Sequence, residues 1–125
     1  MDKDLVLSSL GHTWLLDLDG TILKHNGYKT DGEDTFLEGA EEFLRNIPEK
    51  DMVIFLTSRT DDERERTELF LKNNHIRYAH IIYNMPYGER ILVNDKKNSG
   101  LKTAIAVNGD RDIFFKRNII IDRSL

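Results

Sequence analysis

Two carboxylates of chemical interest, Asp17 and Asp19, come at the end of the apolar stretch Trp14-Leu15-Leu16. A short apolar run that ends at a turn signal is typical of a buried strand in a parallel sheet. Such sheets keep their chemistry beyond the carboxyl ends of their strands, and side chains two residues apart leave a strand on the same side. Gly20 then permits a sharp turn of the chain. Because two neighbouring carboxylates repel each other without a cation or a shared proton, the pattern favours a functional site over core packing.

Hydroxyl groups follow the next apolar run, residues 52–56, where that strand should end. Thr57 and Ser58 stand there, directly before a predicted helix. A hydroxyl beside the free backbone N–H groups of a helix N-terminus can bind a phosphate, although the same hydroxyl can also serve only as a cap. Arg59 comes next, and it could pair with a phosphate or with one of the two aspartates that follow it. The pattern indicates a phosphate-binding position.

A third candidate position follows the apolar run at residues 90–93, where Asp95 stands after Asn94. A carboxylate at the end of a strand suits Mg²⁺, which prefers oxygen ligands and keeps several waters. Lys96 and Lys97 come immediately after it. Either lysine could neutralise a phosphate, and a pair of solvated surface lysines is the alternative interpretation.

The string at residues 17–21, Asp-Leu-Asp-Gly-Thr, resembles motif I of the haloacid dehalogenase (HAD) superfamily of phosphoryl-transfer enzymes. Thr57 resembles the hydroxyl of motif II, and Asp95 resembles the acidic residue of motif IV. The resemblance implies that Asp17 is the nucleophile and that Asp19 is the general acid/base. It also implies a Mg²⁺ site made by Asp17, Asp95 and Asp19, the last through its backbone carbonyl.

Motif III departs from the family pattern. Many small HAD proteins have a lysine directly before a proline between the third and fourth strands, whereas this chain has Met85-Pro86. The stretch that begins at Asp95 resembles a subgroup of small HAD proteins often linked to sugar-phosphate or capsule metabolism, and the pattern of that subgroup favours Lys97 for the missing lysine. The resemblance then implies that Thr57, Ser58 and Lys97 hold the phosphoryl oxygens.

The alternation of apolar runs and helical patterns predicts a parallel sheet with right-handed crossovers. After the first strand, Asn26-Gly27 predicts a hairpin flap, whose Lys24, His25 and Lys29 could touch an anionic substrate. The elements expected after the flap are helices at residues 35–47 and 60–74, and strands at residues 52–56, 78–83, 90–93, 103–107 and 118–121.

These elements predict an α/β fold, a Rossmann-like three-layer sandwich with a mainly parallel sheet. The resemblance implies a single HAD-like hydrolase domain over residues 1–125, with the flap hairpin after the first strand. About 30 residues separate Thr21 from the second strand, and one helix alone follows Thr57, so no cap domain is expected. An open site of this kind suits a large substrate or one closed by a neighbouring subunit, so a homo-oligomer is also expected as a partner.

Composition excludes several other classes of protein. The chain of 125 residues has no cysteine, which excludes disulfides, thiolate catalysis and cysteine-based zinc sites. Its formal net charge of -4 argues against a nucleic-acid binder that works by bulk charge. The N-terminal stretch is too briefly apolar for a signal peptide, and no apolar run is long enough to cross a membrane. A soluble cytoplasmic protein without a membrane partner is expected.

The predicted function is a Mg²⁺-dependent phosphatase that acts through an aspartyl-phosphate on a small phosphorylated metabolite, such as a sugar phosphate. Two alternatives stay open. A receiver domain is phosphorylated on an aspartate at its third strand, whereas here that strand ends in Ile82-Tyr83-Asn84. The other alternative is an HAD fold without activity that serves as a binding module, and it rests on the displaced lysine.

Overall fold

Parallel strands form both sheets of the structure, a computed structural model that describes residues 4–125. The chain divides into two units, which are described in turn: unit 1 comprises residues 1–10, 88–108 and 116–125, and unit 2 comprises residues 11–87 and 109–115. The prediction of an α/β fold with mainly parallel strands is confirmed. The single domain over residues 1–125 and the three-layer, HAD-type arrangement stay predictions.

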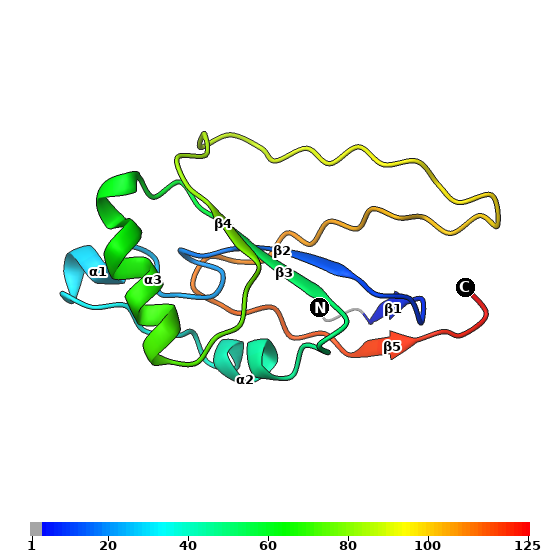
Figure 1. Cartoon of the computed structure of the whole chain (residues 1–125), viewed down its shortest axis with the longest axis horizontal. Coiled ribbons are helices and arrows are strands. Elements are labelled where there is room, and N and C mark those ends of the chain that lie inside the picture. The colour runs from blue at the N-terminus through cyan, green and yellow to red at the C-terminus, as the bar shows by residue number, and fades with distance from the viewer. Residues whose placement is uncertain (1–3) are drawn as a thin grey trace. The chain divides into compact units, whose positions relative to one another are not determined.

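The sheet of unit 2 has three strands in the order β2-β3-β4 (Figure 1). They are β2 at Thr13–Asp17, β3 at Met52–Leu56 and β4 at His80–Ile82. Asp17 pairs in register with Leu56, and Leu56 pairs with Ile82, so the three carboxyl ends meet at one edge. The predicted strands at residues 52–56 and 78–83 are therefore confirmed, the second in shortened form.

One face of this sheet carries the hydrophobic core. Leu16, Val53 and Phe55 are buried, and they share a cluster with Leu44 and Leu71 from two helices. The side chains that alternate with them on β2 and β3 are more exposed, with exposed fractions of 43% for the leucine at position 15 and 46% for the methionine at position 52. The strands thus follow the inward and outward alternation of a sheet with one buried face, whereas burial on both faces was expected.

The helix predicted at residues 60–74, which follows β3 along the chain, matches its predicted range. It begins with a 3₁₀ turn η1 at Asp61–Glu63 and continues as α3 at Arg64–Asn73. The Thr60 side chain makes no capping hydrogen bond there, although the backbone N–H of Glu63 donates to the Thr60 carbonyl. The Thr60 hydroxyl therefore does not cap this helix.

The helix that follows the flap is shorter than the sequence pattern predicted. It is α2 at Ala40–Arg45, whereas a helix over residues 35–47 was expected. Its N-cap is Gly39. The φ of Gly39 is 88°, in the left-handed region that residues with a side chain rarely adopt. The left-handed turn separates the helix from Thr35, where the helix was expected to begin.

The flap after β2 is a short helix instead of the predicted hairpin. The helix, α1, covers Gly27–Thr30, and Asn26 caps it with a left-handed φ of 54°. Asn-Gly favours a positive φ, and a helix cap uses that preference as well as a hairpin turn does. Leu23 pairs with Phe36 in an isolated antiparallel bridge, which is the only hairpin-like pairing among the described residues of this flap.

Unit 1 contains a two-stranded parallel sheet. Strand β1 at Leu5–Leu7 pairs with β5 at Ile119–Ile121, which confirms the predicted strand at residues 118–121 and adds a strand that the sequence analysis missed. Between them, residues 88–108 form neither helix nor strand, so the strands predicted at residues 90–93 and 103–107 are wrong. Ile91 and Val93 are 85% and 86% exposed, because an apolar run forms a strand only where another strand pairs with its backbone. Across residues 4–125, no helix has the length and apolar character needed to cross a membrane.

Candidate functional site

Asp17 lies at the carboxyl end of β2, beside the end of β3. The hydroxyl Oγ1 of Thr21 donates a hydrogen bond of 3.0 Å to its Oδ2, which fixes the carboxylate against the turn that follows. Thr57 is the next residue after β3, and Leu56 before it is the register partner of Asp17. The local sequence patterns therefore bring the first predicted site residue and the predicted phosphate-binding position to the same edge of the sheet.

The turn after Asp19 is tight and is closed by a distant segment of unit 2. Gly20 has a φ of 85°, and the backbone N–H groups of residues 21–23 donate to the Leu18 carbonyl. Asp112 bridges this turn, because its N–H donates to the Gly20 carbonyl at 2.8 Å and its Oδ1 accepts from the His25 N–H at 2.7 Å. These bonds fix the backbone around the two aspartates.

Asp19 is held by an arginine that follows β3. Nε of Arg59 donates to Oδ2 of Asp19 at 2.9 Å, and Nη2 donates to Oδ1 at 2.8 Å. Paired hydrogen bonds of this kind fix both the position and the plane of a carboxylate. Each Asp19 oxygen still has a second lone pair that can accept a proton.

The other side of the same guanidinium binds Asp34. Nη1 and Nη2 of Arg59 donate to the two Asp34 oxygens at 3.1 and 2.7 Å, and Nη1 also donates to Thr67 at 2.8 Å. With the bonds to Asp19, all five N–H groups of an arginine have acceptors here. The Tyr28 ring lies 4.3 Å from the guanidinium carbon.

This set of acceptors determines the ionisation of Arg59, which is only 4% exposed. Burial by itself lowers the pKa of Arg59, but the hydrogen bonds and charges of Asp19 and Asp34 outweigh it and raise the pKa above its ordinary value. The sequence analysis expected Arg59 to bind a phosphate or one of the aspartates that follow it. The structure corrects that expectation, because its donors are taken by Asp19, Asp34 and Thr67.

Thr57 and Ser58 differ in their surroundings. Thr57 is 1% exposed, and its Oγ1 accepts a hydrogen bond of 3.0 Å from the Arg59 N–H. This is the local turn bond that a threonine commonly makes to the residue two positions later. Ser58 is partly exposed at the same end of β3. Phosphate binding by either hydroxyl stays a prediction.

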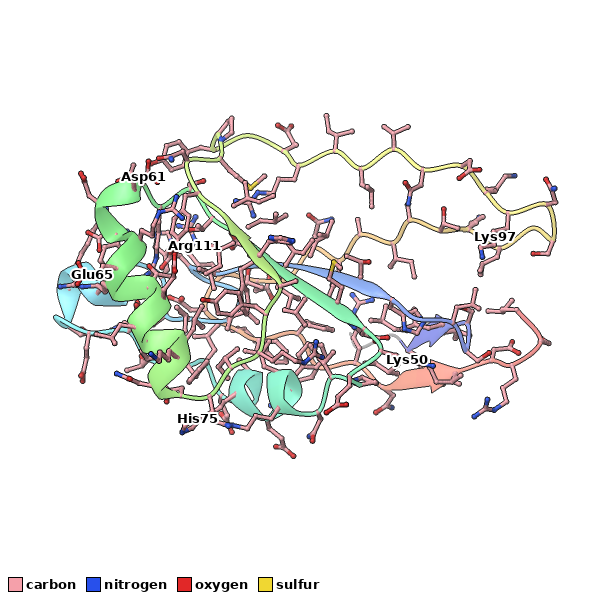
Figure 2. All side chains as sticks on the ribbon, in the orientation of Figure 1. Lys50, Asp61, Glu65, His75, Lys97 and Arg111 are labelled. Atoms are coloured by element: carbon pink, nitrogen blue, oxygen red, sulfur yellow. The ribbon has the colours of Figure 1, made fainter. Side chains whose placement is uncertain are left out.

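Asp95 and Lys97 belong to unit 1 and make local backbone hydrogen bonds there. Thr103 Oγ1 donates to the Asp95 carbonyl, and the Lys97 N–H donates to the Leu101 carbonyl at 3.0 Å. Figure 2 shows Lys97 on the long loop at residues 88–108. Participation of these two side chains in a site with Asp17 stays a prediction.

The donor groups around Asp17 fit part of the predicted Mg²⁺ site. The Asp17 carboxylate is an oxygen ligand, and no backbone N–H among the described residues donates to the Asp19 carbonyl outside the helices and strands. The Asp19 side chain fits poorly, because both of its oxygens accept from Arg59. Within residues 4–125, no group of three or more His, Asp or Glu side chains could hold a metal ion.

The two lysines of the flap interact within the flap itself. Lys24 Nζ pairs with Asp31 Oδ2 at 2.7 Å, and Lys29 Nζ lies 5.6 Å from the centre of the Tyr28 ring. Nδ1 of His25 is buried without a hydrogen-bond partner in the described part of the chain. A contact from these three side chains to an anionic substrate stays a prediction.

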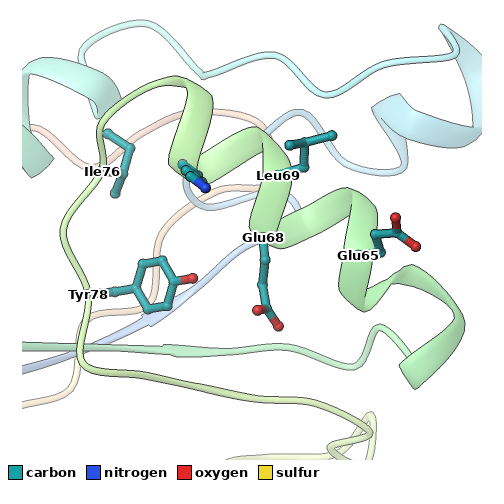
Figure 3. Close-up of a pocket in the computed structure, with 6 residues that line it drawn as sticks. Glu65, Glu68, Leu69, Ile76 and Tyr78 are labelled. Atoms are coloured by element: carbon teal, nitrogen blue, oxygen red, sulfur yellow. The ribbon is translucent and has the colours of Figure 1, made fainter.

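A separate pocket lies beside α3, at the segment that leads into β4 (Figure 3). Its lining combines opposite charges with apolar groups and includes none of the predicted site residues. The lining residues are Glu65, Glu68, Leu69, Lys72, Ile76 and Tyr78.

No sequence pattern pointed to Asp34, the second carboxylate on Arg59. It is 7% exposed and stands in the loop between α1 and α2, where no apolar run or capping pattern distinguishes it. Its partner is 25 residues away in sequence, so only the folded chain brings the two together.

The comparisons with known proteins give one structural similarity. No protein-family model matches the sequence, and no curated protein matches it. A chain of the solved Pnkp1/Rnl/Hen1 complex is similar in fold, with a TM-score of 0.51 and 28% sequence identity over 66% of this chain. The similarity covers 31% of that other chain, so the present chain spans about a third of its length.

Proposed function

We propose that the chain is a Mg²⁺-dependent phosphatase of the HAD type, which hydrolyses a small phosphorylated metabolite, such as a sugar phosphate, through an aspartyl-phosphate. What supports the proposal most is the edge of the unit 2 sheet where Asp17 ends β2 beside Thr57, with Asp19 two residues further on and fixed by Arg59. A nucleophile needs a partner that moves protons, and these two carboxylates are suited to those separate roles.

In the proposed first step, a carboxylate oxygen of Asp17 attacks phosphorus. The bond between phosphorus and the ester oxygen breaks, and Asp19, which enters this step protonated, gives its proton to the leaving alkoxide. In the second step, Asp19 takes a proton from a water molecule that attacks the phosphorus of the aspartyl-phosphate. Inorganic phosphate leaves, and the Asp17 carboxylate is restored.

The Asp17 carboxylate and the Asp19 carbonyl would hold the Mg²⁺, with Asp95 as the further ligand that the family resemblance implies. When bound, the metal supplies positive charge that orients and neutralises the phosphoryl oxygens. Thr57, Ser58 and Lys97 would bind the remaining phosphoryl oxygens. A cytoplasmic location and closure of the open site by a second copy of the chain belong to the same proposal.

The test is release of inorganic phosphate from an aryl phosphate by the purified chain with Mg²⁺. Asp17→Asn should abolish release, because it removes the attacking charge. Asp19→Asn should lower kcat by about 10² to 10⁴-fold with an alkyl phosphate and by less with an aryl phosphate, whose leaving group needs no proton. Chelation of the metal should stop turnover. Full activity in EDTA, or an active Asp17→Asn variant, would contradict the proposal.

Phosphate uptake, measured beside phosphate release, separates the two alternative functions. A phospho-acceptor domain of the receiver type would take up phosphate from an acyl phosphate and keep it, without catalytic turnover. A binding module with an inactive HAD fold would neither take up phosphate nor release it. Uptake of labelled phosphate by the chain from an acyl phosphate, measured beside steady-state phosphate release on one preparation, distinguishes the three outcomes.

A further inference from the structure

We propose that Arg59 is a positioning residue for Asp19 in the phosphatase reaction, and that Asp34 holds Arg59 in place. The inference rests on the proposed function and adds two residues that the family resemblance did not provide. It starts from one buried cluster: a guanidinium that lies between two carboxylates and contacts each of them with two N–H groups.

Arg59 itself is not placed to bind the substrate. Its side chain is 1% exposed, and its five N–H groups have acceptors on Asp19, Asp34 and Thr67. A phosphate would have to displace one of these carboxylates to reach it. Arg59 therefore acts on the reaction through Asp19.

Asp19 is the member of the cluster that faces solvent. Its side chain is 18% exposed, whereas that of Asp34 is 1% exposed. The two donors from Arg59 fix the carboxylate plane and leave one lone pair on each oxygen for proton transfer. Without the guanidinium, the side chain could rotate about its bonds, and a misplacement of about 1 Å costs a proton-transfer step roughly 10²-fold.

Asp34 and Tyr28 connect the cluster to the flap. Asp34 lies between α1 and α2, and the Tyr28 ring of α1 packs on the guanidinium at 4.3 Å. Arg66 of α3 also lies over that ring, at 5.8 Å, and its Nη1 donates to the Tyr28 carbonyl. Arg66 is ion-paired with Glu63, so it offers a control arginine beside the same ring.

The experiment is a double-mutant cycle between the Arg59 cluster and Asp19. The pair Arg59→Met with Asp34→Asn removes the guanidinium without leaving a buried carboxylate charge. It is measured with Asp19 present and again in the Asp19→Asn background. The expected result is a fall in kcat of about 10- to 100-fold with Asp19 present, a KM that changes by less than about twofold, and almost no further loss in the Asp19→Asn background.

Two further variants sharpen the cycle. Arg59→Lys keeps a charge but cannot donate to both carboxylates in the same fork, so its kcat should fall between the wild type and the neutral pair. If the neutral pair does not fold, Arg59→Lys replaces it in the double-mutant cycle with Asp19→Asn. Arg66→Met, the control, should leave kcat unchanged.

Melting temperatures provide a readout that does not depend on activity. They are measured for the four proteins of the cycle: the wild type, the Arg59→Met/Asp34→Asn pair, Asp19→Asn, and the protein with all three changes. Shifts that fail to add show that Arg59 and Asp19 contact each other in solution, and additive shifts overturn the proposal. If the wild type releases phosphate and the cluster variant loses the same factor in both backgrounds, the positioning role is overturned while the proposed function stands. If the contact is present but the wild type releases no phosphate, the proposed function fails, and the positioning role fails with it.

Discussion

Asp51 connects the starts of two strands whose other ends form the candidate site. It is 3% exposed, and it accepts hydrogen bonds from the His12 backbone N–H at 2.9 Å, from the His12 ring at 3.2 Å and from Trp14 Nε1 at 3.0 Å. His12 directly precedes β2, and Asp51 directly precedes β3. These bonds fix the register in which Asp17 and Leu56 pair.

Asp51→Ala should lower the free energy of unfolding by about 2–4 kcal/mol. The substitution leaves the His12 N–H and the Trp14 indole N–H without their acceptor, and each unsatisfied buried donor costs roughly 1–3 kcal/mol. The lower half of that range applies because both donors are only partly buried. Trp14→Phe removes one of these bonds and keeps an aromatic ring, so it should cost less.

The loss of unfolding free energy caused by Asp51→Ala should become smaller at low pH. Burial alone raises the pKa of Asp51, but the hydrogen bonds from Trp14 and His12 outweigh it, so its pKa lies below the ordinary value of 3.8. A lowered pKa in the folded state stabilises the protein above the pKa of the unfolded state, and this stability is lost as the pH falls through the folded pKa. The difference between the wild type and Asp51→Ala should therefore shrink as the pH falls below about 4.

Urea denaturation of both proteins, in a series from about pH 2.5 to pH 7, measures this difference. Asp62→Ala, at an exposed aspartate on the turn before α3, is the control and should not change the free energy of unfolding. A loss below about 0.5 kcal/mol for Asp51→Ala, or a difference that grows as the pH falls below about 4, would refute the reasoning.

Two further predictions concern the turn between the aspartates and the flap. Gly20→Ala should lower the free energy of unfolding by about 1–2 kcal/mol, because φ is 85° and an added Cβ would lie 3.1 Å from Arg111 Cγ. Gly32→Ala has the same kind of backbone strain, with a φ of 80° and nothing within 4 Å, so a smaller loss there isolates the contact with Arg111. If the proposed function holds, Thr21→Val should lower kcat about tenfold through the lost hydrogen bond to Asp17, and Thr21→Ser should restore it; equal kcat values for the two variants would contradict this role.

The elements that the sequence predicted well are those encoded by short-range patterns. The strand at residues 52–56 and the helix that ends near residue 74 each depend on a continuous apolar run or helical period. The runs at residues 90–93 and 103–107 have the same apolar character, but neither pairs as a strand in the structure. Strand formation depends on a partner far away in sequence, which the run itself does not specify.

In the candidate site too, some residues could be predicted from local patterns and others could not. Asp17 and Thr57 meet because each ends a predictable strand, and adjacent parallel strands bring their carboxyl ends together. The partners of Arg59 could not be predicted, because Asp34 and Asp19 are 25 and 40 residues away from it. Proximity in sequence pointed to the aspartates after Arg59 instead.

The charges of Asp17 and of the neighbouring Arg59 cluster determine which further cations a phosphate substrate would require. Asp17, Asp19 and Asp34 supply three carboxylates, and Arg59 is a single guanidinium whose donors are all engaged with two of them and with a hydroxyl. A doubly charged phosphate that approaches Asp17 would therefore meet net negative charge, and the repulsion would be strongest where water is excluded. Under the proposed function, the compensating cations must come from outside this cluster, and Mg²⁺ and Lys97 are the cations that the proposal supplies. The buried arginine thus makes the metal and Lys97 more necessary to the proposed reaction, because it cannot take the place of either.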